Sequence, residues 1–341
     1  MKFDFVIGNP PYQETLQNTS DRPIYNKFID AAYEIADIVE LITPARFLFN
    51  AGKTPKAWNE KMLNDEHLKV LLYEPDSNKV FTNTDIKGGV TVTYHDVNVK
   101  NGAIGSFTPY SELNSILHKV KSHKEFQTIC NIITTSFAYH YTDKLHEDYP
   151  EAEGLLSKGH AYDLKSNAFD RLPMIFKDVK PEDGYEYIRI LGRQNNERTY
   201  KYIRRDYVNS VQNLDKYKLF ISKANGTGSF GEILTLPELC EPNVGSTESF
   251  VGIGMFDSET ENNNALKYIK TKFMRAMLGV LKITQDLTPS KWQWVPLQDF
   301  TSQSDIDWSQ SIAEIDQQLY KKYGLSDEEI AFIETNVKEM E

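Results

Sequence analysis

Four consecutive residues near the amino terminus, Asn9-Pro10-Pro11-Tyr12, supply the groups needed to hold a planar ring that carries an exocyclic amine. The Asn9 side-chain carbonyl and the Pro10 main-chain carbonyl can accept the two amine hydrogens, which leaves the nitrogen lone pair less conjugated and directed at an electrophile. The Tyr12 ring offers a flat face for stacking. Together these groups suit methylation of an amine on a base that is flipped out of a duplex.

The residues around this tetrapeptide predict its position in a sheet. Phe3–Ile7 is apolar and β-branched enough to predict a buried strand, and the two prolines then prevent both further strand pairing and helix entry. We therefore expect the tetrapeptide at the carboxyl end of a strand, where open α/β sheets bind their ligands. The alternative is an ordinary strand exit that a Pro-Pro pair terminates.

The next seventy residues predict an α/β arrangement. Apolar periodicity predicts helices over 24–37 and 56–63 and strands over 38–43, 68–73 and 90–94. This order is typical of the second half of a doubly wound sheet that ends in an antiparallel hairpin. The polar segment between the tetrapeptide and the first helix is expected to be a loop over the site, as a lid or a substrate contact.

In this context, Asn9-Pro10-Pro11-Tyr12 resembles the catalytic motif of the adenine-specific amino-methyltransferases of bacterial restriction-modification systems. Residues 24–28 resemble the family's helix after the catalytic loop, and residues 42–48 resemble its next strand exit. Val80-Phe81 together with residues 87–90 resembles the hairpin motif whose aromatic residue packs on the flipped adenine.

The resemblance implies a specific reaction and a role for each motif residue. A methyl group would pass from S-adenosylmethionine to the exocyclic amine of adenine in double-stranded DNA, and no metal is expected. Asn9 and the Pro10 carbonyl would position the amine, while Tyr12 and Phe81 would clamp the base. For Phe81, a core aromatic at a strand end is the alternative.

From about residue 108 the regular alternation stops. We expect a partial doubly wound, Rossmann-like methyltransferase sheet over residues 1–110, followed by a mixed α+β target-recognition domain over residues 111–341. Helical spacing predicts one long helix over 264–284 and two terminal helices over 311–323 and 326–339. The remaining pieces of the second domain are expected to be extended, over 174–176, 185–191, 200–203, 217–222 and 291–296.

Basic residues gather in one part of this otherwise acidic chain. Tyrosine, asparagine and glutamine side chains are interleaved with them, and the opposing charges in the sequence are chiefly Glu197 and Asp206. This composition is expected of a surface that meets phosphates and base edges in DNA. A solvated edge hairpin is the alternative. The six cations are Arg189, Arg193, Arg198, Lys201, Arg204 and Arg205.

Residues Gly226–Gly231 spell GxGxxG after a predicted strand, which raises the question of a cofactor loop. A cofactor loop with that fingerprint must be followed directly by a helix. Here the residues after Gly231 show no helical periodicity before Pro237. A loop of the recognition domain is therefore favoured.

The principal cofactor motif of the resembled family precedes Asn-Pro-Pro-Tyr, and only two residues stand before Phe3. We expect that motif to be absent. Three explanations stay open: a fragment or subunit completed by a second polypeptide, a DNA-binding remnant, or a permuted enzyme that uses the Gly226 loop. A sheet built only from the later strands would have an unpaired edge, which predicts association with another element.

Composition narrows the remaining function classes. A chain of 341 residues at 40% hydrophobic is long enough for two cores, and its net charge of −11 argues against a protein that coats nucleic acid non-specifically. Two distant cysteines, no signal peptide and no apolar segment of membrane-spanning length predict a cytoplasmic protein. A methylase of RNA bases or protein glutamine is a rival, and a nuclease is the weakest alternative.

Overall fold

The computed structural model describes residues 3–14, 22–51, 53–82 and 86–340. The chain divides into two compact units, residues 1–114 (unit 1) and residues 115–341 (unit 2). The division falls inside helix α3 (Ser111–Ser122), whose first residue is close to the predicted domain boundary. The loop predicted between the tetrapeptide and the first helix lies mostly outside the described residues.

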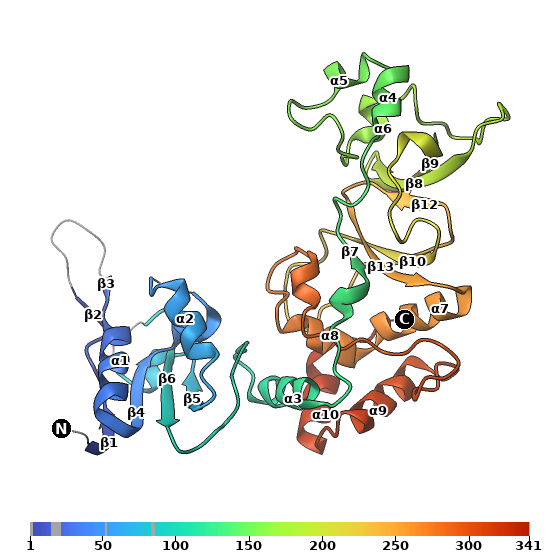
Figure 1. Ribbon diagram of the computed structural model, residues 1–341. Coiled ribbons are helices and arrows are strands. Elements are labelled where there is room, and N and C mark those ends of the chain that lie inside the picture. Colours follow the sequence, from blue (N-terminus) through green and yellow to red (C-terminus); the bar gives the residue numbers. More distant parts are fainter. Residues whose placement is uncertain (1–2, 15–21, 52, 83–85, 341) are drawn as a thin grey trace. The chain divides into compact units, whose positions relative to one another are not determined.

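Unit 1 is built on a four-stranded mixed sheet in the order β1-β4-β6-β5 (Figure 1). Strand β1 (Phe3–Gly8) runs parallel to β4 (Ala36–Pro44), and helix α1 (Tyr25–Ile35) connects the two. Strand β6 (Val90–Asp96) is antiparallel both to β4 and to β5 (Leu68–Glu74). The predicted helix, strands and closing antiparallel hairpin are confirmed.

The core of unit 1 forms where α1 packs on the sheet. Tyr25, Ile29 and Ala32 follow one another at helical spacing and are buried. Phe47 and Trp58 close this core with ring centroids 5.4 Å apart. The smaller elements of unit 1 are β2 (Gln13–Glu14), β3 (Arg22–Pro23), η1 (Ala45–Phe49), α2 (Lys56–Leu63) and η2 (Ser77–Lys79).

Strand β1 is exposed, so the prediction of a buried strand is wrong. Phe3, Phe5 and Ile7 are 47%, 45% and 69% exposed. Among the described strands β1 pairs only with β4, and its other edge has no partner. The apolar sequence is that of a central strand, but no described element covers these side chains or that edge.

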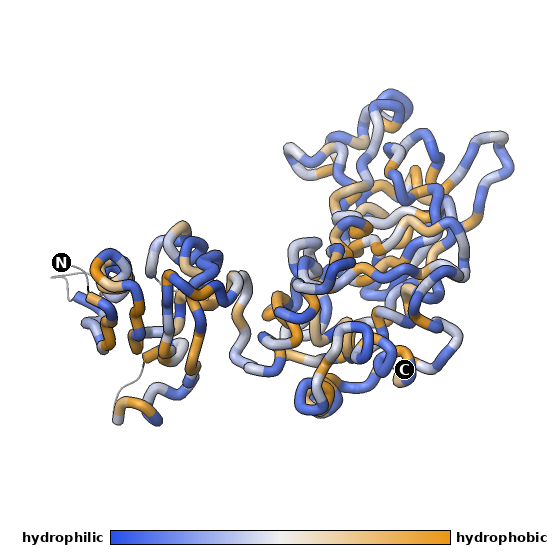
Figure 2. The backbone as a smooth tube through the Cα atoms, turned by 60° about the horizontal axis from the view of Figure 1, so that its bottom comes forward, coloured by the Kyte–Doolittle hydropathy of each residue, from blue (hydrophilic) through white to orange (hydrophobic). Residues whose placement is uncertain are grey.

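Unit 2 contains two further sheets and most of the helices. Hydrophobic (orange) and hydrophilic (blue) stretches alternate along its backbone (Figure 2). One sheet has the order β11-β10-β13-β7 and the other has the order β12-β8-β9. The strands are β7 (Ile133–Thr134), β8 (Tyr187–Gln194), β9 (Glu197–Arg204), β10 (Tyr217–Ser222), β11 (Glu238–Cys240), β12 (Val244–Ser246) and β13 (Phe250–Phe256). The helices are η3 (Ile129–Ile132), α4 (Asp143–Asp148), α5 (Ala152–Leu155), α6 (Ala168–Arg171), η4 (Arg205–Tyr207), α7 (Glu259–Lys270), α8 (Lys272–Gly279), η5 (Pro289–Trp292), α9 (Ile312–Lys322) and α10 (Asp327–Asn336).

The long helix predicted over 264–284 is broken at Thr271, between α7 and α8. Thr271 adopts an extended backbone and its hydroxyl accepts a hydrogen bond from the Met274 amide, so that it caps α8. The buried Asp316 carboxylate accepts from the amides of Lys272 and Phe273 at 2.9 and 2.8 Å. Apolar periodicity continues across the break, which is why the sequence pattern suggested one helix.

Two other local predictions are wrong. Residues 173–175 form a turn in place of the strand predicted over 174–176, and the segment predicted as extended from residue 291 begins in the short helix η5. The terminal helices are confirmed as α9 and α10, and each begins with a capping box, at Ser311 and Ser326 respectively. No described helix is long and apolar enough to cross a membrane.

The Asp316 cap predicts an unusual pH dependence of stability. Burial raises the pKa of this carboxyl to about 6, although the two amide donors oppose the shift. Since the folded state binds this proton more tightly than the unfolded state, the group favours folding below about pH 4 and loses that effect as pH rises to about 6. The free energy of unfolding, measured in urea for the protein and for Asp316→Asn, should therefore differ between the two by an amount that changes between pH 4 and 6. A constant difference would contradict the assignment.

Candidate active site

Three connections of unit 1 meet at one end of its sheet. β1 and β4 are parallel, so the residues after Gly8 and those after Pro44 leave the sheet at the same end. β5 and β6 are joined at that end as well, since Glu74 and Pro44 both pair with Val90, the first residue of β6. The sheet therefore brings together segments that are distant in sequence.

The tetrapeptide leaves β1 at this end and is partly exposed, although the Tyr12 hydroxyl itself is buried. Asn9 and Pro11 are exposed, and Pro10 and Tyr12 are half-buried. No donor from the described residues reaches the Pro10 carbonyl. The carbonyl that the sequence assigned to amine binding is thus not engaged by another part of the described chain.

Tyr12 is held by packing and by its main chain. Its ring lies against the unit 1 core, and its carbonyl accepts from the Ile24 amide at 3.1 Å. Burial raises the pKa of the Tyr12 hydroxyl, while the neighbouring Asn9 side chain acts in the opposite direction. The phenol is therefore neutral at ordinary pH. A neutral ring is suitable for stacking on a base.

Phe81 lies beside Tyr12, although 69 positions separate them in the sequence. The two ring centroids are 6.3 Å apart, and the ring planes meet at 64°. Phe81 is half-buried. The structure therefore brings together Asn9, Pro10, Tyr12 and Phe81, which the sequence had placed in one site.

A short turn after β5 positions Phe81. Its amide donates to the Ser77 carbonyl at 2.8 Å, and the Ser77 hydroxyl accepts from the Ile86 amide at 2.8 Å. Gly89 then returns the chain to β6 with φ of 77°, and its carbonyl accepts from the Ala45 amide at 3.0 Å. A Cβ on Gly89 would lie 2.3 Å from the Glu74 carbonyl oxygen, so only glycine fits here.

Substituting Gly89 by alanine is expected to destabilise unit 1 by more than backbone strain alone, which contributes about 1–3 kcal/mol. Gly159→Ala is a matched control, because Gly159 has φ of 79° but a Cβ added there would meet no atom within 4 Å. Urea unfolding of both variants measures the difference. Equal losses of unfolding free energy in the two variants would show that the Glu74 contact is unimportant.

Arg46 is a candidate site residue that sequence reasoning did not single out. It lies in η1 at the same end of the sheet, is exposed, and makes no ion pair with another described residue. Its side chain packs against Gly88, the other glycine of the β6 turn, since a Cβ there would lie 2.6 Å from the Arg46 Cγ. The only available signal was a lone arginine directly after a predicted strand.

The six cations of unit 2 do not form one surface. In the antiparallel β8–β9 hairpin, directly opposed residues share a face, and Arg193 opposes Arg198 while Lys201 opposes Ile190. Arg189, Arg193, Arg198 and Arg204 therefore lie on one face, Lys201 on the other, and Arg205 beyond the end of β9.

Five of these six cations are paired with carboxylates of the chain itself, and Arg193 is not. Of the two carboxylates expected to oppose these cations, Asp206 does so as a partner of Arg204, but most of the other acidic partners come from distant segments. Glu197 forms no ion pair with another described residue. The pairs are Arg189–Glu241, Arg198–Glu238, Lys201–Asp178, Arg204–Asp206 with Asp148, and Arg205–Asp215.

The glycine-rich loop of unit 2 binds a carboxylate of its own chain. The Glu232 carboxylate accepts from the amides of Thr227 and Gly228 at 2.7 and 3.0 Å and from the buried Lys282 ammonium. Burial alone would raise the pKa of Glu232, but Lys282 and the two amides lower it to about 2. The loop does not open a helix, and the amides that a cofactor anion would need are already used.

Comparison with known proteins finds a family match for the amino-terminal part of the chain. Residues 1–81 match the Eco57I restriction-modification methylase family. This methylase-family region contains the whole of Asn9-Pro10-Pro11-Tyr12 and ends at Phe81, so it includes both halves of the candidate site. The resemblance to restriction-modification methylases is thereby confirmed for this region.

Relatives extend beyond this chain in length. An uncharacterised adenine-specific methylase of Mycoplasma pneumoniae (strain ATCC 29342 / M129 / Subtype 1) is 30% identical over 95 residues, which is 26% of this chain and 22% of the relative. The type IIG restriction endonuclease BpuSI is similar with a TM-score of 0.32 and 10% identity, over 94% of this chain and 50% of that one. The type IIL enzyme MmeI, solved with DNA, gives a TM-score of 0.30 and 10% identity over 97% and 56%. The chain thus spans about a fifth of the curated relative and half of BpuSI.

Proposed function

We propose that unit 1 presents the exocyclic amine of an adenine, flipped out of double-stranded DNA, for methylation by a restriction-modification methylase. The observation that carries this proposal is the meeting of Tyr12 and Phe81 beside Asn9 and the Pro10 carbonyl, to which no donor of the described residues bonds. Two aromatic faces and two carbonyl acceptors match the ring and the amine of a flipped adenine.

The ring geometry fits a base only after one ring has turned. A base that stacks between two rings needs the ring planes nearly parallel and separated enough to admit it. The centroids of Tyr12 and Phe81 are already 6.3 Å apart, but the planes are tilted by 64°. To admit a base, the Phe81 ring would therefore have to rotate more than the two segments would have to move apart.

The methyl donor expected for this reaction is S-adenosylmethionine, and the described residues do not fit it. Glu232 uses the amides of the glycine-rich loop, which was the one alternative site in the sequence. We therefore propose that further strands, carrying the donor site, cover the free edge of β1 and its exposed Phe3, Phe5 and Ile7. The completed sheet would be doubly wound and Rossmann-like, and the donor-site strands would belong to a second polypeptide segment.

DNA contacts around the flipped base would come from the same end of the sheet. Arg46 is exposed there and has no carboxylate partner among the described residues, so it is available to a phosphate. Methylases of this kind act on the DNA of their own cell, which sets the proposed place of action in the cytoplasm.

A double-mutant cycle at the two rings tests the clamp. Tyr12→Ala and Phe81→Ala should each weaken binding of a duplex with a flipped or mismatched adenine by about 5- to 150-fold, since one base–aromatic stack contributes about 1–3 kcal/mol. The combined loss should be smaller than the sum of the two, because the rings share one base. Phe28→Ala is the matched control, since Phe28 is an exposed phenylalanine of α1 in the same unit.

The substrate class is tested with the same protein together with the polypeptide that carries the donor site. Labelled methyl transfer should be found on duplex DNA and should fall with Tyr12→Ala. Transfer to RNA or to a glutamine-containing peptide, with none to DNA, would overturn the proposal.

A further inference from the structure

We propose that the turn of the β8–β9 hairpin reads base edges in the DNA on which the chain acts. The hairpin turn is defined as residues 193–197. This inference rests on the DNA substrate proposed above and goes beyond it, because it assigns sequence reading to four side chains: Arg193, Asn195, Asn196 and Glu197.

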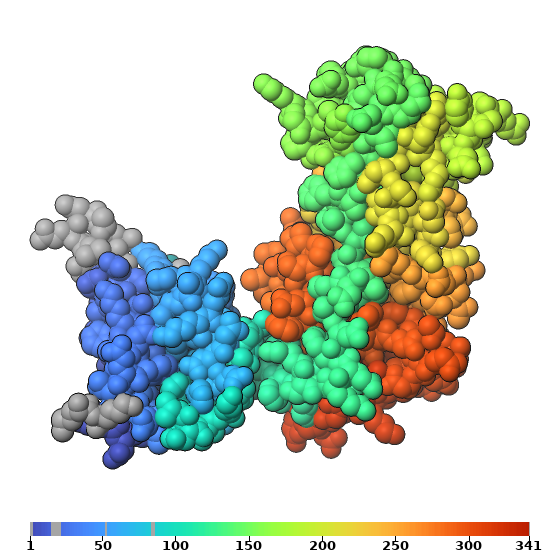
Figure 3. Space-filling view, viewed as in Figure 1, coloured from blue at the N-terminus to red at the C-terminus, as the bar shows by residue number. Residues whose placement is uncertain are grey.

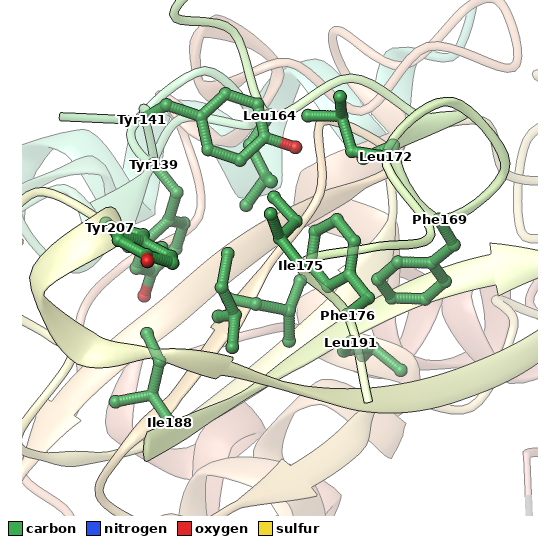
Figure 4. Close-up of a cluster of buried hydrophobic side chains, with 14 of the residues drawn as sticks. Tyr139, Tyr141, Leu164, Phe169, Leu172, Ile175, Phe176, Ile188, Leu191 and Tyr207 are labelled. Carbon is green, nitrogen blue, oxygen red and sulfur yellow. The ribbon is translucent and has the colours of Figure 1, made fainter. Parts of the chain in front are cut away.

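The stem of the hairpin is fixed in the core of unit 2. Ile188, Ile190 and Ile203 are each at most 1% exposed. Gly192 lies directly under the Phe169 ring, since a Cβ there would be 2.5 Å from that ring. Figure 4 shows Ile188 and Leu191 in this cluster, below Phe169 and Phe176. A rigid stem gives the turn beyond it a defined position.

The connection between the strands is the tightest that a hairpin allows. Gln194 pairs with Glu197, which leaves only Asn195 and Asn196 between β8 and β9. Their φ angles are 52° and 64°, so both adopt the left-handed backbone of a type I′ turn. The side chains at the turn therefore project from a narrow two-stranded ribbon.

The four side chains at the turn are exposed and are not committed to other parts of the chain. Arg193, Asn195, Asn196 and Glu197 are all exposed. Within the described residues, the Arg193 guanidinium donates only to the Asn196 carbonyl across the turn, at 2.9 Å. None of the four side chains forms an ion pair there. Arginine pairs with guanine, asparagine with adenine and glutamate with the cytosine amine, so the set matches base edges.

The charges of the stem indicate that the turn, and not the stem, contacts the DNA. Arg189, Arg198 and Arg204 are each held by a carboxylate of the chain, so they have little charge to offer to phosphates. An acidic Glu197 at the turn would be repelled by a phosphate but can accept from a base edge. The combination favours entry of the turn into a groove over attachment along the DNA backbone.

The size and position of the hairpin agree with this role. The major groove of B-DNA is about 12 Å wide and admits a two-stranded β-ribbon. Figure 3 shows the green to yellow segments that contain β8 and β9 at one end of unit 2, and the red helices α9 and α10 at the other. The hairpin is therefore not covered by the terminal helices of its own unit.

Asparagine is also common in type I′ turns for purely conformational reasons, and one substitution separates the two roles. Asn196→Gly produces Asn-Gly, the sequence that this turn prefers, and it keeps the main-chain carbonyl that Arg193 contacts. The variant should be as stable as the original protein. If Asn196 serves only the turn, its DNA binding should also be unchanged.

The experiment is selection of binding sites from a pool of random DNA duplexes, with the full chain, Asn196→Gly and Arg193→Ala. We expect the original chain to select a defined sequence. Each variant should lose about 5- to 150-fold of its preference at one or two adjacent base pairs, in line with about 1–3 kcal/mol for one side chain–base pairing. Both variants should keep their affinity for unrelated duplex DNA, and Lys177→Ala, a change at an exposed lysine beside β9, should leave the selected sequence unaltered.

Failure of this inference and failure of the DNA function give different results. If the original chain selects a sequence and both variants select the same one with equal preference, the turn is not the reader and the proposed function stands. Binding without any sequence preference would also overturn the inference alone. If the original chain binds no duplex DNA, the proposed function fails, and the inference fails with it.

Discussion

Replacing Asn9 by alanine should lower the rate of DNA methylation by about 100- to 1,000-fold, the usual loss when one preorganised polar contact to the reacting group is removed. The Asn9 carbonyl is proposed to accept one hydrogen of the amine, and the Pro10 carbonyl cannot replace it. Asn9 is exposed and follows the last residue of β1, so the stability of unit 1 should not change. Initial rates with duplex DNA and labelled methyl donor give the comparison.

The matched control for this change is Asn98→Ala. Asn98 is also exposed, and it follows β6 at the opposite end of the same sheet. Its loss should leave the methylation rate within about twofold of the original. A methylation rate of Asn9→Ala that equals that of the control would remove Asn9 from the mechanism, whatever else the tetrapeptide does.

Replacing Glu232 by alanine should lower the free energy of unfolding of unit 2 by about 3–5 kcal/mol, which is the cost of removing one partner from a buried ion pair. Lys282 is 4% exposed, and the variant would leave its ammonium group without a carboxylate. The amides of Thr227 and Gly228 would lose their acceptor as well. Urea unfolding measures the loss.

The double variant Glu232→Ala, Lys282→Met shows whether the buried charge is the cause. Removing both charges should recover a large part of the loss, because no unpaired ammonium remains. The pH dependence gives a second test: the depressed pKa of Glu232 contributes stability above about pH 4.5, and this contribution is lost as pH falls toward 2. If the single and double variants are equally unstable, packing of the loop, and not the ion pair, determines its stability.

The sequence predicts unit 1 well because its local signals and its fold agree. Apolar periodicity and the proline stops are local, and they place α1, β4, α2, β5 and β6 correctly. The pairing of Tyr12 with Phe81 could be predicted only from the family resemblance, since 69 positions separate the two rings. The exposure of β1 could not be predicted, because an apolar strand has the same sequence pattern whether or not its neighbouring strands are present.

Unit 2 shows where single-sequence reasoning ends. The break at Thr271 depends on a cap from Asp316, which lies 45 residues away and leaves no periodic signal. The cation-rich stretch looked like a DNA surface because its carboxylate partners, such as Glu238 and Glu241, are distant in sequence. Long-range ion pairs decide whether a cluster of arginines is available to a ligand, and they are visible only in the fold.

The central claim is that this chain directs a methyl group to the exocyclic amine of adenine in DNA. Nucleoside mass spectrometry tests it most directly, after duplex DNA has been incubated with the chain, the polypeptide proposed to carry the donor site, and methyl donor. We expect N6-methyldeoxyadenosine in the digested DNA, and none when Asn9→Ala replaces the original chain. Methylation of cytosine in place of adenine, or an equal yield of N6-methyldeoxyadenosine from the Asn9→Ala chain, would contradict the claim.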